Sequence, residues 1–356
     1  MKTLLLPAAA ALLIQPFSAP LATDYKAGKT VKITSTTEYS MEVVDFEMLV
    51  DGEPMEGRGG GDRMTTESRT IEQTDEWLAA ENGSLTKLKR SFASIEGGGT
   101  MTFGENEMEN EREAPLSGVT LMMERGEEGL TVEVTDGTEP DDEALLEGHE
   151  PELALDGLLP EGDLAEGAEY KLDQEAIFKA LGLDLESKYF PRPQREEGAE
   201  GEGRGRGGRG GRGMRGGGRS PFQPFNDIEW EGKATVASME ADLEGDTCVK
   251  IALEIKGEGE LPERERGERR GGRGRGGRAL ELATPAPIAT NYEVKLEGAL
   301  YFSTTHKMPV RLELEGSLSQ DRETERSRGE RSMTIISLEE GELTHVVSIE
   351  VEAKDK

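Results

Sequence analysis

The sequence has little of what many extracellular proteins and enzymes depend on. Cys248 is the only cysteine, so no disulfide can form within one chain, and no cysteine is available near the N-terminus to accept a lipid. The three histidines, His149, His306 and His345, have no metal-ligand spacing, and the chain has neither an HExxH nor a GxSxG motif. The sequence therefore predicts a non-catalytic protein without a cofactor. An enzyme stays an alternative, because active sites assemble in space.

Long apolar runs are also missing. The run Leu4–Ile14 has eleven residues, about half of the roughly 20 that a helix needs to cross a bilayer. With Lys2 before it and small residues after it, the run is typical of a secretory signal peptide. We predict that residues 1–22 are removed by cleavage between Ser18 and Thr23, that no transmembrane segment remains, and that the protein is extracytoplasmic, either periplasmic or secreted. A buried N-terminal helix is the alternative.

Positive charge is scarce except in two tracts. The chain has 42 basic and 73 acidic residues, a formal net charge of −31. Arg204–Arg219 and Arg264–Arg278 together hold thirteen arginines and two glutamates, and without them the remainder carries 29 basic and 71 acidic residues, a net charge of −42. Such a body repels nucleic acid and anionic membranes, so we expect no specific nucleic-acid partner.

The two Gly/Arg tracts, RGG-like and of low complexity, allow two interpretations. Arginine binds phosphate and sulfate in a bidentate manner, and glycine lets successive side chains adapt, which predicts weak polyanion contacts. Single-strand binders usually add aromatic rings for base stacking, whereas the only other residue type inside Arg204–Arg219 is Met214, so a solvated insertion is the preferred reading. The candidate polyanion contacts are Arg204, Arg206, Arg209, Arg212, Arg215, Arg219, Arg269, Arg270, Arg273, Arg275 and Arg278.

Most of the remaining chain shows the two-residue alternation of β-strands. Apolar residues keep one phase from Val31 to Val43 and take the other from Val44, which predicts a bulge. The longest pattern, Tyr292–Leu318, predicts a hairpin with its turn at Ser303–Pro309. Further strands are predicted at 64–77, 85–95, 100–108, 119–123, 130–134, 228–239, 247–255, 333–338 and 343–351.

Short turns separate many of these strands and imply antiparallel neighbours, since a parallel crossover needs a dozen or more residues. The dipeptides that predict turns are Asp51-Gly52, Asn82-Gly83, Asp136-Gly137, Glu244-Gly245 and Glu340-Gly341. One helix is predicted at Gln174–Leu181, capped by Asp173 and ended by Gly182. The acidic stretch 139–169 before it predicts loop, with a helical turn at 141–146.

These patterns predict a mainly β fold: an antiparallel, strongly curved sheet or incomplete barrel of about 10–12 strands, with one short helix and long disordered insertions. Two segments are too long and too poor in apolar residues to be ordered connections. The predicted organisation is a signal peptide at 1–22, a first β block at 23–190 with the helix near 173–181, a disordered Gly/Arg-rich insertion at 191–226, a β continuation at 227–256, a disordered Arg/Gly/Glu-rich insertion at 257–287, and C-terminal hairpins at 288–356.

Smaller candidates have simpler structural explanations. Five glutamates alternate from Glu105 to Glu113 and would share one face of a strand, where Ca²⁺ could bridge them, but a solvated acidic edge explains them as well. His306 is predicted in a turn and His345 on a strand surface. Cys248 falls in the phase of Lys250, the more polar face, and is predicted to be half-covered and inert rather than reactive.

Two segments carry a resemblance. The segment Glu166–Leu172 (EGAEYKL), which precedes the helix, and the late hairpin Glu297–Leu318 (EGALYFSTTHKMPVRLELEGSL) resemble secreted β-rich proteins of planctomycete-type bacteria. The layout is also similar to half-barrel carriers of the lipoprotein-localisation-factor class, in which a curved sheet holds an acyl chain. The resemblance implies a carrier of a lipid or other amphiphile and assigns no binding residue.

The sequence thus predicts an exported, non-catalytic envelope or secreted protein that binds an apolar or amphiphilic ligand in a curved sheet. The alternative is a polyanion-binding or matrix protein that acts through the Gly/Arg tracts. A cavity lined by one of the apolar rows would favour the carrier, whereas a sheet face filled by packed side chains would favour a structural module.

Overall fold

The computed structural model describes residues 20–55, 63–162, 165–191, 222–261, 288–328 and 331–352. Within them lie thirteen strands, two short α-helices and three 3₁₀ helices. The strands are β1 (Thr30–Val50), β2 (Glu53–Pro54), β3 (Arg63–Glu81), β4 (Ser84–Phe103), β5 (Asn106–Glu111), β6 (Thr120–Gly126), β7 (Gly129–Asp136), β8 (Glu169–Leu172), β9 (Glu229–Leu243), β10 (Asp246–Leu261), β11 (Ile288–Ser303), β12 (Met308–Arg328) and β13 (Arg331–Val351). The helices are η1 (Glu143–Leu146), η2 (Asp156–Leu158), α1 (Gln174–Ala180), α2 (Glu186–Tyr189) and η3 (Gln223–Asn226).

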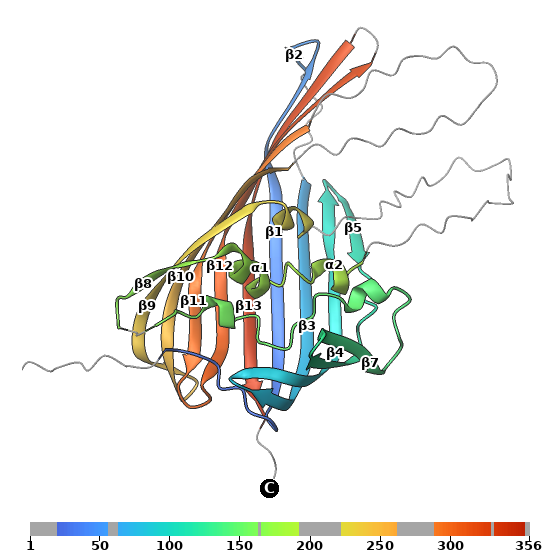
Figure 1. The fold of residues 1–356 in the computed structure, drawn as a ribbon. Helices are drawn as coiled ribbons and strands as arrows, with labels where there is room; N and C mark the ends of the chain where they lie inside the picture. The colour runs from blue at the N-terminus through green and yellow to red at the C-terminus, as the bar shows by residue number, and fades with distance from the viewer. Residues whose placement is uncertain are drawn as a thin grey trace, which may run out of the picture.

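All thirteen strands belong to one antiparallel sheet, as predicted. Its order is β7-β6-β4-β3-β1-β13-β12-β11-β10-β9-β8, with β2 and β5 as short additions beside β1 and β4. Over the described residues the sheet is not closed, since its path ends at β7 on one side and at β8 on the other. The first and last long strands pair at the centre, so the two strand-rich blocks of the sequence form a single sheet (Figure 1).

In the central strand β1, alternate residues lie on the same face of the sheet. Odd-numbered residues from Val31 to Met41 point to the side that carries the helices, which we call the inner face, and Val31, Tyr39 and Met41 on it are buried. The predicted bulge is confirmed, because the register with β13 shifts between Val43 and Asp45. Beyond the bulge, β1, β12 and β13 extend past the helices (Figure 1).

The predicted hairpin turns at three Gly-containing dipeptides are confirmed. Asp51, Asn82 and Glu244 each have positive φ, between 52° and 56°, and the glycine after each has φ between 81° and 91°. Two consecutive positive φ values match the right-handed twist of the flanking strands. The long C-terminal hairpin is also confirmed, as β11 ends at Ser303 and β12 begins at Met308.

The turn predicted at Glu340-Gly341 is wrong, because β13 runs through it without a break. A Cβ atom at Gly341 would lie 1.8 Å from the carbonyl oxygen of Ser40 on β1, so glycine serves close strand approach there rather than a turn. The break predicted between the strands 85–95 and 100–108 is wrong for the same reason, because β4 continues through the triplet Gly97–Gly99. The ring of Phe190 lies where a Cβ atom of Gly97 would be.

Both insertion boundaries need correction. The prediction of disorder to residue 226 is wrong for its last residues, since Phe222 is 1% exposed and packs against Tyr39. Phe225, in η3, is also buried. The second insertion begins later than predicted, since β10 extends to Leu261. The remainder of both insertions, including every candidate polyanion-binding arginine, lies outside the described residues, as do residues 1–19 of the predicted signal peptide.

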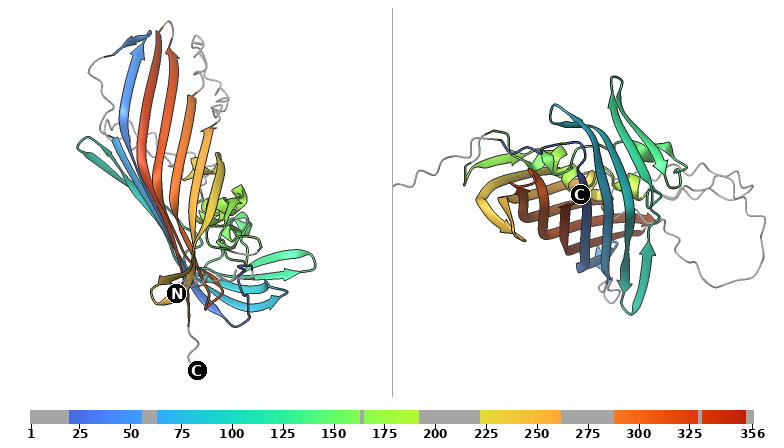
Figure 2. Two further views of the ribbon diagram at one scale, coloured as in Figure 1. Left: turned by 90° about the vertical axis from the view of Figure 1, so that its left-hand side faces the viewer. Right: turned by 90° about the horizontal axis from the view of Figure 1, so that it is seen from below.

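The helices cover the inner face of the sheet. We call η1, η2, α1, α2 and their connecting loops, between residues 138 and 190, the cap (Figures 1 and 2). The predicted helix is confirmed: the Asp173 carboxylate accepts from the amides of Glu175 and Ala176, and Gly182 has φ of 63°. The four-residue helix α2, which sequence patterns did not predict, follows it. Figure 2 shows the sheet curving around the cap.

Candidate ligand-binding site

The strands β3, β1 and β13 place their inner-face residues in cross-strand rows. Antiparallel partners directly opposite each other share a face, so each row can be read from the register. Along the strands the rows are Asp75–Val31–Val351, Gln73–Ile33–Ile349, Ile71–Ser35–Val347, Arg69–Thr37–His345 and Glu67–Tyr39–Leu343. The second and third rows combine four branched apolar side chains with one amide and one hydroxyl.

Those two rows form the floor of a cavity of about 420 Å³ between the sheet and the cap. Such a volume lies within the ~300–1,000 Å³ typical of small-molecule pockets. Leu153, Leu155, Ala176 and Ala180 of the cap also line it, and each is buried. The cavity is therefore mainly apolar inside, with Gln73 and Ser35 as polar groups on the floor.

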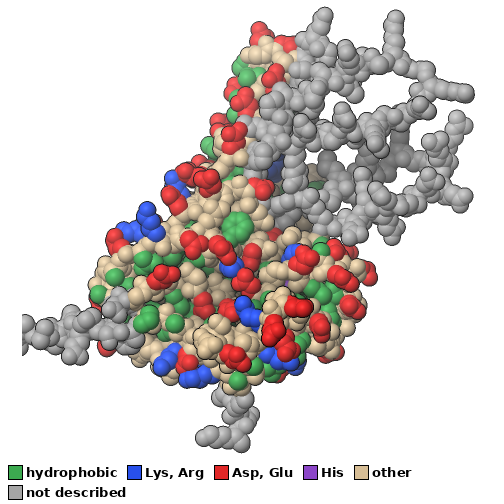
Figure 3. All heavy atoms as spheres, in the orientation of Figure 1, with side chains coloured by type: hydrophobic (Ala, Val, Ile, Leu, Met, Phe, Trp, Pro, Cys, Tyr) green, Lys and Arg blue, Asp and Glu red, His purple; other side chains and the backbone are tan. Residues whose placement is uncertain are grey.

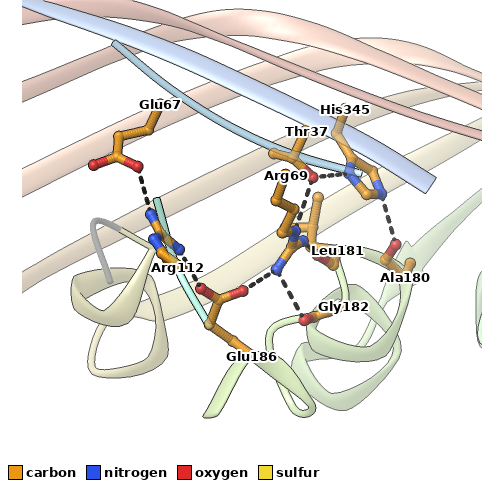
Figure 4. A network of polar contacts seen from close by, with 9 residues as sticks. All are labelled: Thr37, Glu67, Arg69, Arg112, Ala180, Leu181, Gly182, Glu186 and His345. Atoms are coloured by element: carbon orange, nitrogen blue, oxygen red, sulfur yellow. Dashed lines mark hydrogen bonds and ion pairs between the residues drawn. The ribbon is translucent and has the colours of Figure 1, made fainter. Parts of the chain in front are cut away.

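A buried polar network anchors the cap at one end of the cavity (Figure 4). Arg69, 1% exposed, donates from Nη1 to Glu186 Oε2 at 2.5 Å and to the Gly182 carbonyl at 3.2 Å, and Nη2 donates to the Leu181 carbonyl. In the same row, Thr37 Oγ1 lies 2.8 Å from His345 Nδ1, and His345 Nε2 donates to the Ala180 carbonyl at 2.9 Å. The carbonyls at the end of α1 have no partner within the helix, and side chains of the sheet donate to them instead.

The network continues through Glu186 to a second arginine. Arg112 donates to Glu186 Oε1 at 3.1 Å and to Glu67 Oε2 at 2.6 Å, so two arginines and two carboxylates alternate (Figure 4). Burial raises the pKa of Glu67, and the ion pair with Arg112 opposes that change. Because each charge has a partner, the desolvation of the group is offset.

A second polar contact anchors the cap at the other side. The Asp156 carboxylate of η2 accepts from Thr23 Oγ1 and from Tyr25 Oη, each at 2.5 Å, and Tyr25 Oη accepts from the Leu153 amide at 2.7 Å. Burial raises the pKa of Asp156 to about 6, and the two hydroxyl donors oppose that increase. The cap is therefore fixed by two polar contacts, one to the sheet through Arg69 and His345 and one to the segment before β1 through Asp156.

Another charged pair beside the cavity is already neutralised. Arg90 lines the cavity and is bound in a bidentate manner by Asp75, with Nε–Oδ1 at 2.8 Å and Nη2–Oδ2 at 2.7 Å. Both side chains are buried. A ligand would meet this arginine as a compensated group rather than as a free positive charge.

The other residues singled out in the sequence do not contribute to the cavity. The glutamates from Glu105 to Glu113 are exposed, and the described residues contain no group of His, Cys, Asp or Glu that could hold a metal ion. His306 lies in the β11–β12 turn as predicted. Cys248 is fully buried rather than half-covered, at a place where the register of β10 with β9 shifts. Burial raises the pKa of its thiol to about 11.

The prediction that His345 lies on a strand surface is wrong, because the alternation along β13 places it among buried residues. His345 shares its face with Leu343, Val347 and Ile349, so it is 1% exposed beneath α1 instead of on an open strand surface. A signal for the network was present in β3, where Arg69 and Asp75 occupy the phase of Ile71 and Trp77. Charged residues in a buried phase require buried partners.

Comparison with known proteins adds no assignment. No protein-family profile and no curated protein matches this chain. Among solved structures, the outer membrane protein OprG from Pseudomonas aeruginosa is similar at 5% identity and a TM-score of 0.19, over 92% of this chain and 99% of that one. A TM-score this low supports no conclusion about fold or function. None of the helices described here is long and apolar enough to cross a membrane.

We expect the fold to lose stability on acidification because of two buried histidines. Burial lowers the pKa of His345 to about 3 and that of His149 to about 4, whereas an unfolded histidine titrates near pH 6.5. As the pH falls from 7 to 5 the unfolded chain binds protons first, which costs about 2 kcal/mol per histidine. Asp156 acts in the opposite direction, since its raised pKa stabilises the fold by about 1 kcal/mol over the same interval. Burial also raises the pKa of Asp184 to about 6, and this residue acts in the same direction as Asp156, with a smaller effect because its side chain is exposed to solvent.

Urea unfolding at pH 7, 6 and 5 measures this dependence. His345→Gln should remove about 2 kcal/mol of the loss, because glutamine can keep the contacts to Thr37 and the Ala180 carbonyl without titrating. His306→Gln, at the exposed turn, is the matched control and should leave the dependence unchanged. An identical pH dependence in the wild type and in His345→Gln would contradict the assignment.

Proposed function

We propose that this protein is an exported, non-catalytic carrier or binding protein that holds an apolar or amphiphilic small molecule in the cavity between sheet and cap. The observation that supports it is the cavity floor, where Ile33, Ile71, Val347 and Ile349 line the cavity at the edge of the hydrophobic core. A face packed throughout would have favoured a structural module. Export is supported by the signal-peptide pattern of residues 1–22.

The anchors explain how such a cavity persists in a stable fold. Apolar side chains normally close on one another, because each square ångström of apolar surface removed from water contributes ~25 cal/mol. Here the cap cannot settle onto the floor, since Arg69 and His345 fix the end of α1 and Asp156 fixes η2. An apolar ligand would cover the part of Ile33 that stays exposed and fill the space above the floor, at little cost in rearrangement.

A cavity-filling substitution tests the proposal. Ile33 lies on the floor and is partly exposed to the cavity, so Ile33→Trp should place an indole ring where the ligand binds. We expect wild-type protein to bind the neutral dye N-phenyl-1-naphthylamine at one saturable site, and Ile33→Trp to bind it at least about tenfold more weakly, or about 1.4 kcal/mol. Fluorescence titration gives both affinities.

Thr34→Trp is the matched control, because Thr34 is the next residue of β1 and points to the opposite face. It should bind the dye within about twofold of wild type. Thermal unfolding of both variants shows whether the fold is intact. If the wild type does not bind the dye, or if both variants bind it equally well, the proposed function is wrong.

A further inference from the structure

The mouth of the cavity is strongly acidic. Besides Asp156, which Thr23 and Tyr25 already bind, five carboxylates of the cap line it, whereas the lining includes two cationic side chains, Lys179 and the Arg90 already bound by Asp75. Figure 3 shows the cap side of the molecule, where red acidic side chains outnumber blue basic ones. The five carboxylates are those of Glu150, Glu152, Asp173, Glu175 and Asp184.

The nearby cations leave part of this charge uncompensated. Lys179 Nζ lies 3.0 Å from Glu150 and 2.8 Å from Glu175, so one ammonium group serves two carboxylates. Arg125 pairs with Glu152 at 3.0 Å. Asp173 is the N-cap of α1, and Asp184 has no ion pair among the described residues. The mouth keeps a net negative charge, because its five carboxylates have two partner cations, Lys179 and Arg125.

The floor provides independent evidence about the ligand. Gln73 is 8% exposed, and its Nε2 lies 3.5 Å from Asp75 Oδ1. Its Oε1, on the floor of the cavity, has no hydrogen-bond partner among the described residues. This oxygen is therefore free to accept a hydrogen bond from a ligand in the cavity. Apart from the Ser35 hydroxyl, which can donate or accept, the polar groups open to a ligand around the cavity are thus acceptors: an amide oxygen inside and carboxylates at the mouth.

We propose that the ligand is a cationic amphiphile, with an apolar chain and a protonated amine head. An ammonium group supplies donors and no acceptor, and so it complements both Gln73 Oε1 and the mouth carboxylates. A carboxylate or phosphate head would supply acceptors and negative charge, which this mouth repels. This inference rests on the proposed binding function and adds the chemical class of the ligand.

Displacement of N-phenyl-1-naphthylamine by three ten-carbon probes tests the head group. At neutral pH and low salt we expect decylamine to displace the dye at least about tenfold more effectively than decanol, and decanoate to be the weakest. The preference of decylamine over decanol should decrease at 1 M salt, where the screening length falls to about 3 Å. Ile33→Trp should weaken displaceable dye binding at least about tenfold, which separates the cavity from adsorption to the acidic surface.

Variants that each remove one carboxylate test whether the acidic mouth causes the preference for decylamine. Asp184→Asn should weaken decylamine binding about threefold or more and leave decanol unchanged. Glu350→Gln removes an equal charge from the opposite face of β13 and should change neither. If decanol or decanoate displaces the dye as well as decylamine does, the head-group inference is wrong while the cavity function stands. If none of the three displaces the dye, the proposed function itself fails.

Discussion

Replacing Arg69 with methionine is expected to lower the free energy of unfolding by about 3–5 kcal/mol, because one partner of a buried charge network is lost. Arg69 is 1% exposed and contacts Glu186, Thr37 and the carbonyls of Leu181 and Gly182. Methionine fills similar space but donates no hydrogen bond, so these acceptors would stay buried without a donor. Urea unfolding of the wild type and the variant measures the difference.

Arg125→Met is the matched control for this substitution. The same side chain is removed, but its pair with Glu152 is exposed, with side-chain exposures of 47% and 27%. An exposed pair contributes about 0–1 kcal/mol. Equal losses for the two variants would show that the anchor under the cap is not buried as described. Because the anchor holds the cap above the floor, Arg69→Met should also weaken binding of the neutral dye.

Leu312→Asp is expected to cost at least about 4 kcal/mol and to prevent folding if the wild type is only marginally stable. Leu312 of β12 is fully buried on the inner face, opposite Leu300 and Val347. An unpaired carboxylate there would lose its hydration without gaining a cation, and the apolar contacts of leucine would be lost as well. Thermal unfolding followed by circular dichroism reports the change.

The adjacent residue provides the control. Glu313 points to the outer face and is paired with Arg311 at 2.7 Å in a partly exposed position. Glu313→Gln should therefore change the unfolding free energy by no more than about 0.5 kcal/mol. If the two positions were equally sensitive, both faces of the sheet would have to be covered, and the division into an inner and an outer face would be incorrect.

The strands could be predicted because their alternation is a local property. The phase change at Val43, the hairpin at Ser303–Met308 and the cap of α1 at Asp173 each depend on residues a few positions apart. One wrong prediction concerns glycine, which is common in turns and is also needed where two strands approach closely. Gly341 has the appearance of a turn in the sequence, yet it lies where β1 and β13 approach closely.

The sequence by itself determined the fold class, because a periodicity of two with short turns allows little other than an antiparallel sheet. The tertiary structure decided which face is covered and by what. Whether His345 faces water depends on α1 lying above it, and the cavity is enclosed by a cap that Arg69 and Asp156 bind to distant segments of the chain. Contacts between residues more than a hundred positions apart leave no periodic signal in the chain, since they arise only when the sheet brings distant segments together.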